Sequence, residues 1–227
     1  MPPDTTISLA MEADALATKL ALSLNGKIVL AAKNGQVKAY NNAGIGSTIK
    51  GDYSKAIEYY LKALKISEDI GNKAGQASDL GNIGIVYNMQ GDYPNALDYD
   101  LKALQMDELL GDKQGQTGDL CNVGNVYENL ANYSKSLDYE MKALKLAEDG
   151  GFKLAQENIL GNIGNLYSEL GNSDKALDYY QQALKMDEDL GDKVGQANDL
   201  GNIGLIFNNH KKVPRGLRLF YKGIKNG

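Results

Sequence analysis

The sequence has few of the residue types that most enzyme and metal sites require. Its 227 residues include one cysteine, Cys121, one histidine, His210, and no tryptophan. A single cysteine excludes an internal disulfide framework, and a single histidine leaves no histidine-based triad and no multi-histidine metal site. No nucleophile, base or metal cluster converges elsewhere in the pattern, so we expect no enzymatic activity, no cofactor and no bound metal.

Long apolar runs and positive charge are also scarce. No run of 18 apolar residues occurs, and the start at Met1-Pro2-Pro3-Asp4 lacks the basic segment of a secretory signal. The net charge is −5, although residues 210–227 contain six basic residues and no acidic one. The rest of the chain is therefore acidic, which argues against nucleic acid as a partner. We expect a cytoplasmic protein that binds neither membrane nor nucleic acid.

What the sequence does contain is a repeat with a period of forty residues. Blocks with a shared opening pattern start at Gly81, Cys121, Gly161 and Gly201, and a more divergent copy starts at Asn41. Blocks 81–120 and 161–200 align without a gap and agree at 23 of 40 positions. Self-similarity at a fixed period of this length indicates a stacked repeat array, in which each unit buries its apolar face against its neighbours.

Each repeat has the pattern of two helices joined by a turn. Within residues 75–111 the turn is Gly91-Asp92, and Gly111 follows the last apolar residue as a C-terminal cap. Glycine in the middle of a helix costs about 1 kcal/mol relative to alanine, so its recurrence predicts a close approach of the paired helix. The first helical run contains Leu80, Ile83, Gly84 and Tyr87, and the second contains Ala96, Tyr99, Ala103, Met106 and Leu110.

These residues resemble the tetratricopeptide repeat in its forty-residue variety. The pattern Leu80-x-x-Ile83-Gly84-x-x-Tyr87, followed by Ala96 and Ala103, recurs in register over roughly residues 36 to 227. It is similar to the repeats of the Leu-Gly-Asn spindle-orientation adaptors and of bacterial sensory arrays. The resemblance implies an all-α fold, a right-handed superhelical solenoid of helix-turn-helix repeats.

The expected organisation is an N-terminal segment followed by about five helix pairs. Residues 1–35 are expected to form a helical cap or a degenerate repeat, with a break or kink at Asn25-Gly26. From Pro214 onward we expect a capping helix with a solvated basic face, rather than a segment that binds an anionic surface. The expected helix pairs are 36–71, 75–111, 115–150, 154–191 and 194–227.

The resemblance also implies a binding surface, because the first helix of each tetratricopeptide repeat lines a concave groove that binds peptides or partner segments. On that side of the predicted helices asparagine is frequent and positive charge is nearly absent. Asparagine both donates and accepts hydrogen bonds, so it suits the main chain of an extended peptide. Glu128 and Glu169 would favour basic side chains. The candidate groove residues are Asn82, Asn122, Asn125, Glu128, Asn129, Asn162, Asn165, Glu169, Asn202 and Asn209.

Two alternatives remain open at this point. The recurrent residues Asn82, Asn122, Asn162 and Asn202 either contact a ligand or bond to the neighbouring repeat and set the packing of the array. The function is either that of a scaffold for protein–protein interaction or that of a regulatory, sensory module. Such a module would act by self-association or by control of a separate effector.

Overall fold

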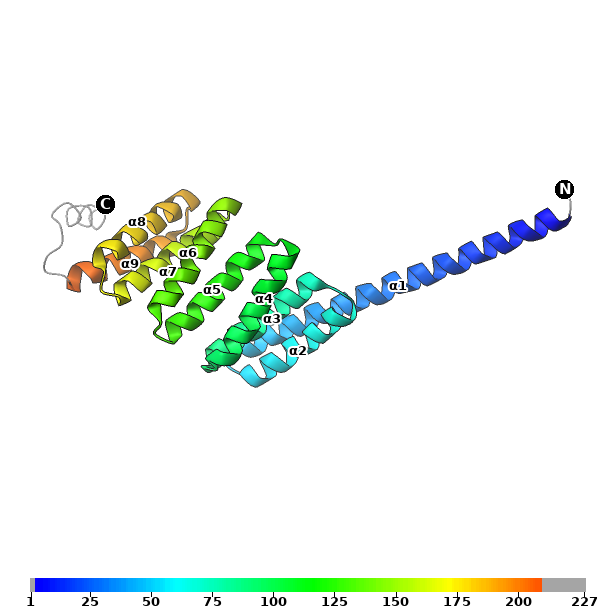
Figure 1. Ribbon diagram of the computed structural model, residues 1–227, viewed down its shortest axis with the longest axis horizontal. Coiled ribbons are helices and arrows are strands. Elements are labelled where there is room, and N and C mark those ends of the chain that lie inside the picture. The colour runs from blue at the N-terminus through cyan, green and yellow to red at the C-terminus, as the bar shows by residue number, and fades with distance from the viewer. Residues whose placement is uncertain (1–2, 210–227) are drawn as a thin grey trace. The chain divides into compact units, whose positions relative to one another are not determined.

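Helices account for the regular structure of this protein. The computed structural model describes the backbone of residues 3–209 and the side-chain environments of residues 22–207, and within this range the chain forms helices and no strand (Figure 1). The all-α, helix-turn-helix class predicted from the repeat is confirmed. The helices are α1 (Pro3–Ile49), α2 (Tyr53–Asp69), α3 (Lys73–Gln90), α4 (Tyr93–Leu110), α5 (Lys113–Asn129), α6 (Tyr133–Gly150), α7 (Lys153–Glu169), α8 (Ser173–Leu190) and α9 (Lys193–Asn209).

Most of the described turns between helices combine a left-handed residue with a capping side chain; the turn before α7 is an exception, because Phe152 makes no side-chain cap hydrogen bond. Gly111 ends α4 with φ of 68°, a conformation that glycine adopts without a steric penalty. The next residue, Asp112, accepts hydrogen bonds from the backbone N–H groups of Gln114 and Gly115, both at 3.0 Å, and so caps α5. The predicted turn at Gly91-Asp92 has the same construction, with φ of 77° at Gly91.

The long helix α1 runs from Pro3 to Ile49 without interruption, so the prediction of a break or kink at Asn25-Gly26 is wrong. Forty residues before the turn at Gly71-Asn72, the chain carries Ala31-Ala32. Alanine disfavours the left-handed conformation because of its Cβ, and it has no side-chain oxygen to cap a new helix. α1 therefore continues where later repeats turn, and Gly26 lowers its stability without ending it.

The chain divides into two compact units, Met1–Asp79 and Leu80–Gly227. In the first unit α1 packs along α2, and Gly44 lies against the ring of Tyr60. The carboxylate of Asp79, at the start of α3, accepts hydrogen bonds from Asn41 Nδ2 and Ser67 Oγ, each at 2.8 Å. These two bonds tie α1, α2 and the start of α3 together.

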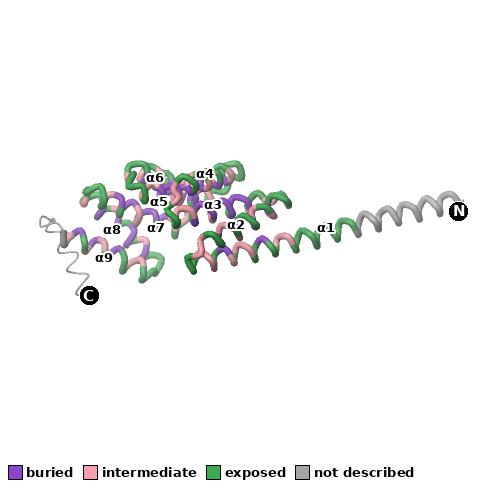
Figure 2. The backbone as a smooth tube through the Cα atoms, turned by 90° about the horizontal axis from the view of Figure 1, so that it is seen from below, coloured by how far each residue is buried: buried purple, intermediate pink, exposed green. Residues whose placement is uncertain are grey.

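In the second unit each helix from α4 to α9 packs against the next one. The core of this unit contains two clusters, and their residues are among the buried parts of the tube in Figure 2. Burial of such side chains is the main favourable term that holds the pairs together. One cluster contains Leu120, Ala143, Leu144, Ala147, Ile159, Leu160, Ile163 and Ala183. The other contains Ala176, Leu177, Tyr180, Leu184, Ile203 and Ile206.

A mid-helix glycine provides the close approach that the sequence predicts. A Cβ at Gly164 of α7 would lie 2.6 Å from Cε1 of Tyr180 on α8, which is closer than carbon atoms can pack. Gly124 of α5 lies against Glu140 in the same way, with 3.1 Å between a Cβ and Oε1. The missing side chain therefore makes room for a large residue of the partner helix.

Stacked tyrosines form a second contact between paired helices, in addition to the contact at the glycine. The ring centroids of Tyr127 and Tyr139 are 5.6 Å apart, and those of Tyr167 and Tyr179 are 5.4 Å apart. The first tyrosine of each stack is half-buried, as expected for an apolar ring with a polar tip. A lysine lies over the stack; the Nζ of Lys175, for example, is 4.8 Å from the ring centroid of Tyr167.

Several carboxyl groups are buried in the helix interfaces. Asp100, which faces Gly84, and Glu140 are fully buried. Both carboxyl oxygens of Asp100 and Oε2 of Glu140 lack a hydrogen-bond partner among the described residues. Burial raises the pKa of each group to about 7, because it disfavours the charged form. Burial, together with the nearby carboxylate of Asp107, raises the pKa of Asp119 to about 8.

Two expectations about the ends of the chain stay untested. The basic segment from Pro214 onward lies outside the described residues, and the division into a cap over 1–35 and five helix pairs remains a prediction. Among the described residues, no helix is long and apolar enough to cross a membrane.

The turn at Ala131 generates a prediction about stability. Ala131 has φ of 54° and occupies the left-handed position that glycine fills in the turns at Gly51, Gly91 and Gly171. A left-handed alanine costs about 1–2 kcal/mol. We therefore expect Ala131→Gly to raise the free energy of unfolding by about 1 kcal/mol in urea titrations. The matched control Gly91→Ala should lower it by a similar amount, and a neutral or destabilising Ala131→Gly would contradict this account.

The buried carboxyls predict that stability falls as the pH rises. In the unfolded chain they titrate near pH 4, whereas in the fold Asp100 and Glu140 titrate at about 7. The folded state therefore binds more protons between these values, and the stability present below pH 4 is lost as the pH rises through 7. We expect a lower thermal midpoint at pH 8 than at pH 5. Asp100→Asn with Glu140→Gln should flatten this dependence, and an unchanged profile would show that these groups do not cause it.

Candidate functional site

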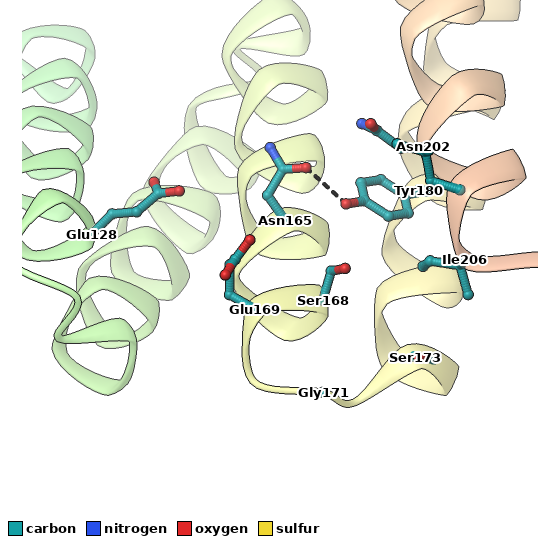
Figure 3. Close-up of a pocket in the computed structure, with 10 residues that line it drawn as sticks. Glu128, Asn165, Ser168, Glu169, Gly171, Ser173, Tyr180, Asn202 and Ile206 are labelled. Carbon is teal, nitrogen blue, oxygen red and sulfur yellow. Dashed lines mark hydrogen bonds between the residues drawn. The ribbon is translucent and has the colours of Figure 1, made fainter. Parts of the chain in front are cut away.

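A pocket lies among the first helices of successive repeats in the second unit. It has a volume of about 380 Å³ and opens between α5, α7 and α9, with the turn after α7 at its lower edge (Figure 3). Because these helices carry the same repeat register, equivalent positions of neighbouring repeats line it together. The lining residues are Glu128, Asn165, Ser168, Glu169, Gly171, Ser173, Tyr180, Asn202, Leu205 and Ile206.

Tyr180 forms one wall of the pocket and holds Asn165. Its ring is 3% exposed and lies in the space left by Gly164, and its hydroxyl donates a 2.7 Å hydrogen bond to Oδ1 of Asn165. Burial raises the pKa of Tyr180 to about 12, so the phenol stays protonated and keeps its donor role at neutral pH. Because Oδ1 accepts this bond, the amide N–H groups of Asn165 are the ones that can donate to a bound molecule.

The pocket is electronegative. Glu128 projects from α5 toward α7, which carries Glu169, and none of the ten lining residues is basic (Figure 3). Partial burial and the nearby charge of Glu169 raise the pKa of Glu128. The two carboxylates would both gain from a cation placed between them. On the side of α9, Leu205 and Ile206 add apolar surface.

The structure brings four of the ten predicted groove residues together in this pocket. They are Glu128, Asn165, Glu169 and Asn202, and they come from three different helices. Five further predicted residues lie on α3, α5 and α7 but do not line it. These are Asn82, Asn122, Asn125, Asn129 and Asn162. The side chain of the tenth, Asn209 of α9, lies outside the described residues.

Two of the asparagines outside the pocket bond to other parts of the protein. Asn162 Nδ2 donates to Oε1 of Glu140 at 3.3 Å, which joins α7 to α6. Asn129 Nδ2 donates to Oδ1 of Asn88 at 3.0 Å, which joins α5 to α3. For Asn162 these contacts favour the structural interpretation over a ligand-binding role.

Sequence reasoning missed Tyr180, which lies on a second helix rather than on the first helix that was expected to line the groove. A signal was present in the alignment of the repeats. The position facing the mid-helix glycine is Tyr60, Asp100, Glu140 and Tyr180 in successive repeats, although the position before it is tyrosine in all four. When one buried position varies in an otherwise regular array, the repeats differ there in their packing and in the side chains that they present to the groove.

The single cysteine also has a packing environment. Cys121 is partly buried against the first core cluster and lies near Glu140. Burial raises the pKa of its thiol, so the side chain stays a thiol rather than a reactive thiolate. This agrees with its place in the repeat, where the other blocks carry glycine.

The model of the tetratricopeptide-repeat family matches residues 36–108 and 119–189, which together are more than half of the chain. The chain belongs to the tetratricopeptide-repeat family. Members of this family are generally non-enzymatic and act as protein-interaction or regulatory modules. No curated protein sequence matches this tetratricopeptide-repeat protein.

Solved structures similar to this tetratricopeptide-repeat protein include three signalling proteins. Aspartyl phosphate phosphatase F from Bacillus subtilis is 16% identical, with a TM-score of 0.72, over 76% of this chain and 45% of its own. A Rap protein complexed with competence and sporulation factor is 16% identical, with a TM-score of 0.63, over 75% and 47%. A signal transduction ATPase with a tetratricopeptide repeat sensor, from Pyrococcus horikoshii, is 22% identical, with a TM-score of 0.64, over 74% and 26%.

At these identities the likeness shows the fold alone. The chain spans less than half the length of each of the three proteins.

The wall at Tyr180 yields a prediction about the packing that shapes the pocket. Gly164→Ala would push a methyl group into the Tyr180 ring, so we expect it to lower the free energy of unfolding by about 2 kcal/mol. The control Gly161→Ala is in the same helix, and its Cβ would meet no atom within 4 Å. It should instead stabilise the protein by up to about 1 kcal/mol through helix propensity. Chemical denaturation of both variants tests this, and equal effects would contradict the close contact.

Proposed function

We propose that this protein is a scaffold for protein–protein interaction that binds a segment of a partner protein in the groove lined by α5, α7 and α9. The observation that carries this proposal is the pocket of about 380 Å³, which gathers Glu128, Asn165, Glu169 and Asn202 from successive repeats. Ligand sites are concave, combine apolar surface with a few convergent polar groups, and are few per protein. The family assignment supports the same class of function.

The chemistry of the pocket favours a segment with a basic side chain. Glu128 and Glu169 offer two carboxylates without a neighbouring lysine or arginine in the lining. A lysine or arginine side chain placed between them would reduce their mutual repulsion and form charge-assisted hydrogen bonds. The Asn165 amide, oriented by Tyr180, can donate to a main-chain carbonyl of the same segment.

The test measures the affinity of the groove for peptides. We expect a peptide array to select sequences that contain lysine or arginine, and we expect their binding to weaken with salt. Removal of both charges by Glu128→Gln with Glu169→Gln should weaken binding at least tenfold, because hydrogen bonds to charged groups contribute about 1.5–3 kcal/mol. Asn165→Ala should weaken it for every selected peptide.

The matched control changes two exposed acids of the second helices, Glu148→Gln and Glu188→Gln, which lie outside the pocket. This variant has the same net charge as the groove variant and should retain full affinity. Equal losses in both variants, or unchanged binding in the groove variant with an unchanged melting temperature, would place the binding site elsewhere.

A regulatory, sensory module is the second candidate. The likeness to the tetratricopeptide repeat sensor of the Pyrococcus horikoshii protein supports it at the level of the fold. In this case the groove would report the presence of its partner to a separate effector, or the chain would act by self-association.

A further inference from the structure

Residues 22–32 of α1 are exposed. They precede the part of the helix that packs along α2, as Figures 1 and 2 show. Leu22 is 68% exposed, and Leu24 and Ile28 are each 60% exposed. Among the described residues, side chains of α1 become partly buried only from Lys33 onward. The first buried one is Val37, which is 7% exposed. An apolar helix of this kind is stable when another surface covers it.

The charge of α1 restricts what that surface is. Residues 15–51 contain five lysines and no acidic residue. Pairing this part of α1 with the same part of another copy would therefore bring two basic segments together. The helices of the second unit have the opposite character, since residues 80–209 contain 21 acidic and nine basic residues; the six basic residues of 210–227 follow them in the sequence. Opposite potentials favour association and fix its register, so an acidic surface of this protein complements α1.

The face of α1 around Lys27 matches the groove in detail. Leu24, Lys27 and Ile28 lie at helical spacing, so they share one face of α1. The groove offers Glu128 and Glu169 to a cation and the exposed apolar side chain of Leu205, which is 62% exposed. The apolar helix face with its central cation thus complements a groove that has two carboxylates on the side of α5 and α7 and apolar surface on the side of α9.

We propose that residues 22–32 of α1 bind in the groove of a second copy of this chain, with Lys27 between Glu128 and Glu169 and with Leu24 and Ile28 against Leu205. The proposal rests on the proposed function of the groove and names its partner, which presents the segment as a helix. Such helix-in-groove recognition uses anchors at i and i+4. The contact joins different surfaces of the two copies, so it is a head-to-tail contact that closes into a ring or grows into longer oligomers.

The test is sedimentation velocity of the full chain at a series of concentrations. The wild-type chain should associate with rising concentration, and an increase in salt from about 0.05 to 0.5 M should weaken that association. Lys27→Glu should weaken self-association at least tenfold, as should Glu128→Lys with Glu169→Lys. Lys38→Glu is the control, because Lys38 is an equally exposed lysine of α1 outside residues 22–32. It should associate like the wild type.

A mixture of the two variants tests directly whether α1 of one copy binds the groove of another. The Lys27→Glu chain keeps an intact groove, and the Glu128→Lys, Glu169→Lys chain keeps an intact α1. An equimolar mixture should therefore form a one-to-one complex, although each variant alone is monomeric. Helical content and thermal midpoints of both variants are measured by circular dichroism. Glu128→Gln with Glu169→Gln replaces the lysine pair if the latter does not fold.

Three outcomes would overturn the inference. Self-association that is lost in Lys27→Glu but retained in the groove variants would assign α1 to pairing with another α1. A monomer that pellets with phosphatidylserine–phosphatidylcholine vesicles through Lys27 would assign α1 to a lipid surface. A monomer whose groove binds basic peptides would refute self-recognition and leave the proposed function intact, whereas a groove that binds neither α1 nor peptides would refute both.

Discussion

At the middle of α3, α5 and α7, a glycine lets a side chain of the following helix lie against the backbone. Gly164 accommodates Tyr180 at a separation that leaves no room for a Cβ, and Gly124 accommodates Glu140, where a Cβ would make a tight contact. The energetic cost of glycine in a helix is offset by burial of the facing residue and by the close packing of the pair. The tyrosine stacks and the apolar clusters occupy positions that this close approach brings within contact distance.

Because the glycine is constant and the facing residue varies, one contact has different consequences along the chain. Where the facing residue is Tyr180, the side chain forms a wall of the pocket and its hydroxyl orients Asn165. Where it is Asp100 or Glu140, a carboxyl is buried without full hydrogen bonding, and its pKa rises to about 7. The same register thus produces a binding feature in one repeat and a proton-binding group in another.

Negative and positive charge are concentrated in different parts of this protein. The acidic residues outnumber the lysines across the helices that carry the pocket, whereas α1 from residue 15 onward is basic and apolar. Even with the buried carboxyls protonated, residues 80–209 keep an excess of negative charge. The pocket has no cation in its lining, and the exposed surface of α1 is basic. The two surfaces are therefore complementary in charge.

The repeat period, the apolar spacing and the turn glycines determined the helix pairs, because each of these signals acts over a few residues and recurs in register. The direction of Glu128, Asn165 and Glu169 toward a common groove also followed from that spacing. Tertiary structure alone decided that α1 stays straight past Asn25-Gly26, because loss of the turn residues at Ala31-Ala32 outweighs a local glycine. It also decided which asparagines bond within the protein and that Tyr180 lines the pocket, since these depend on distances between helices that no local pattern contains.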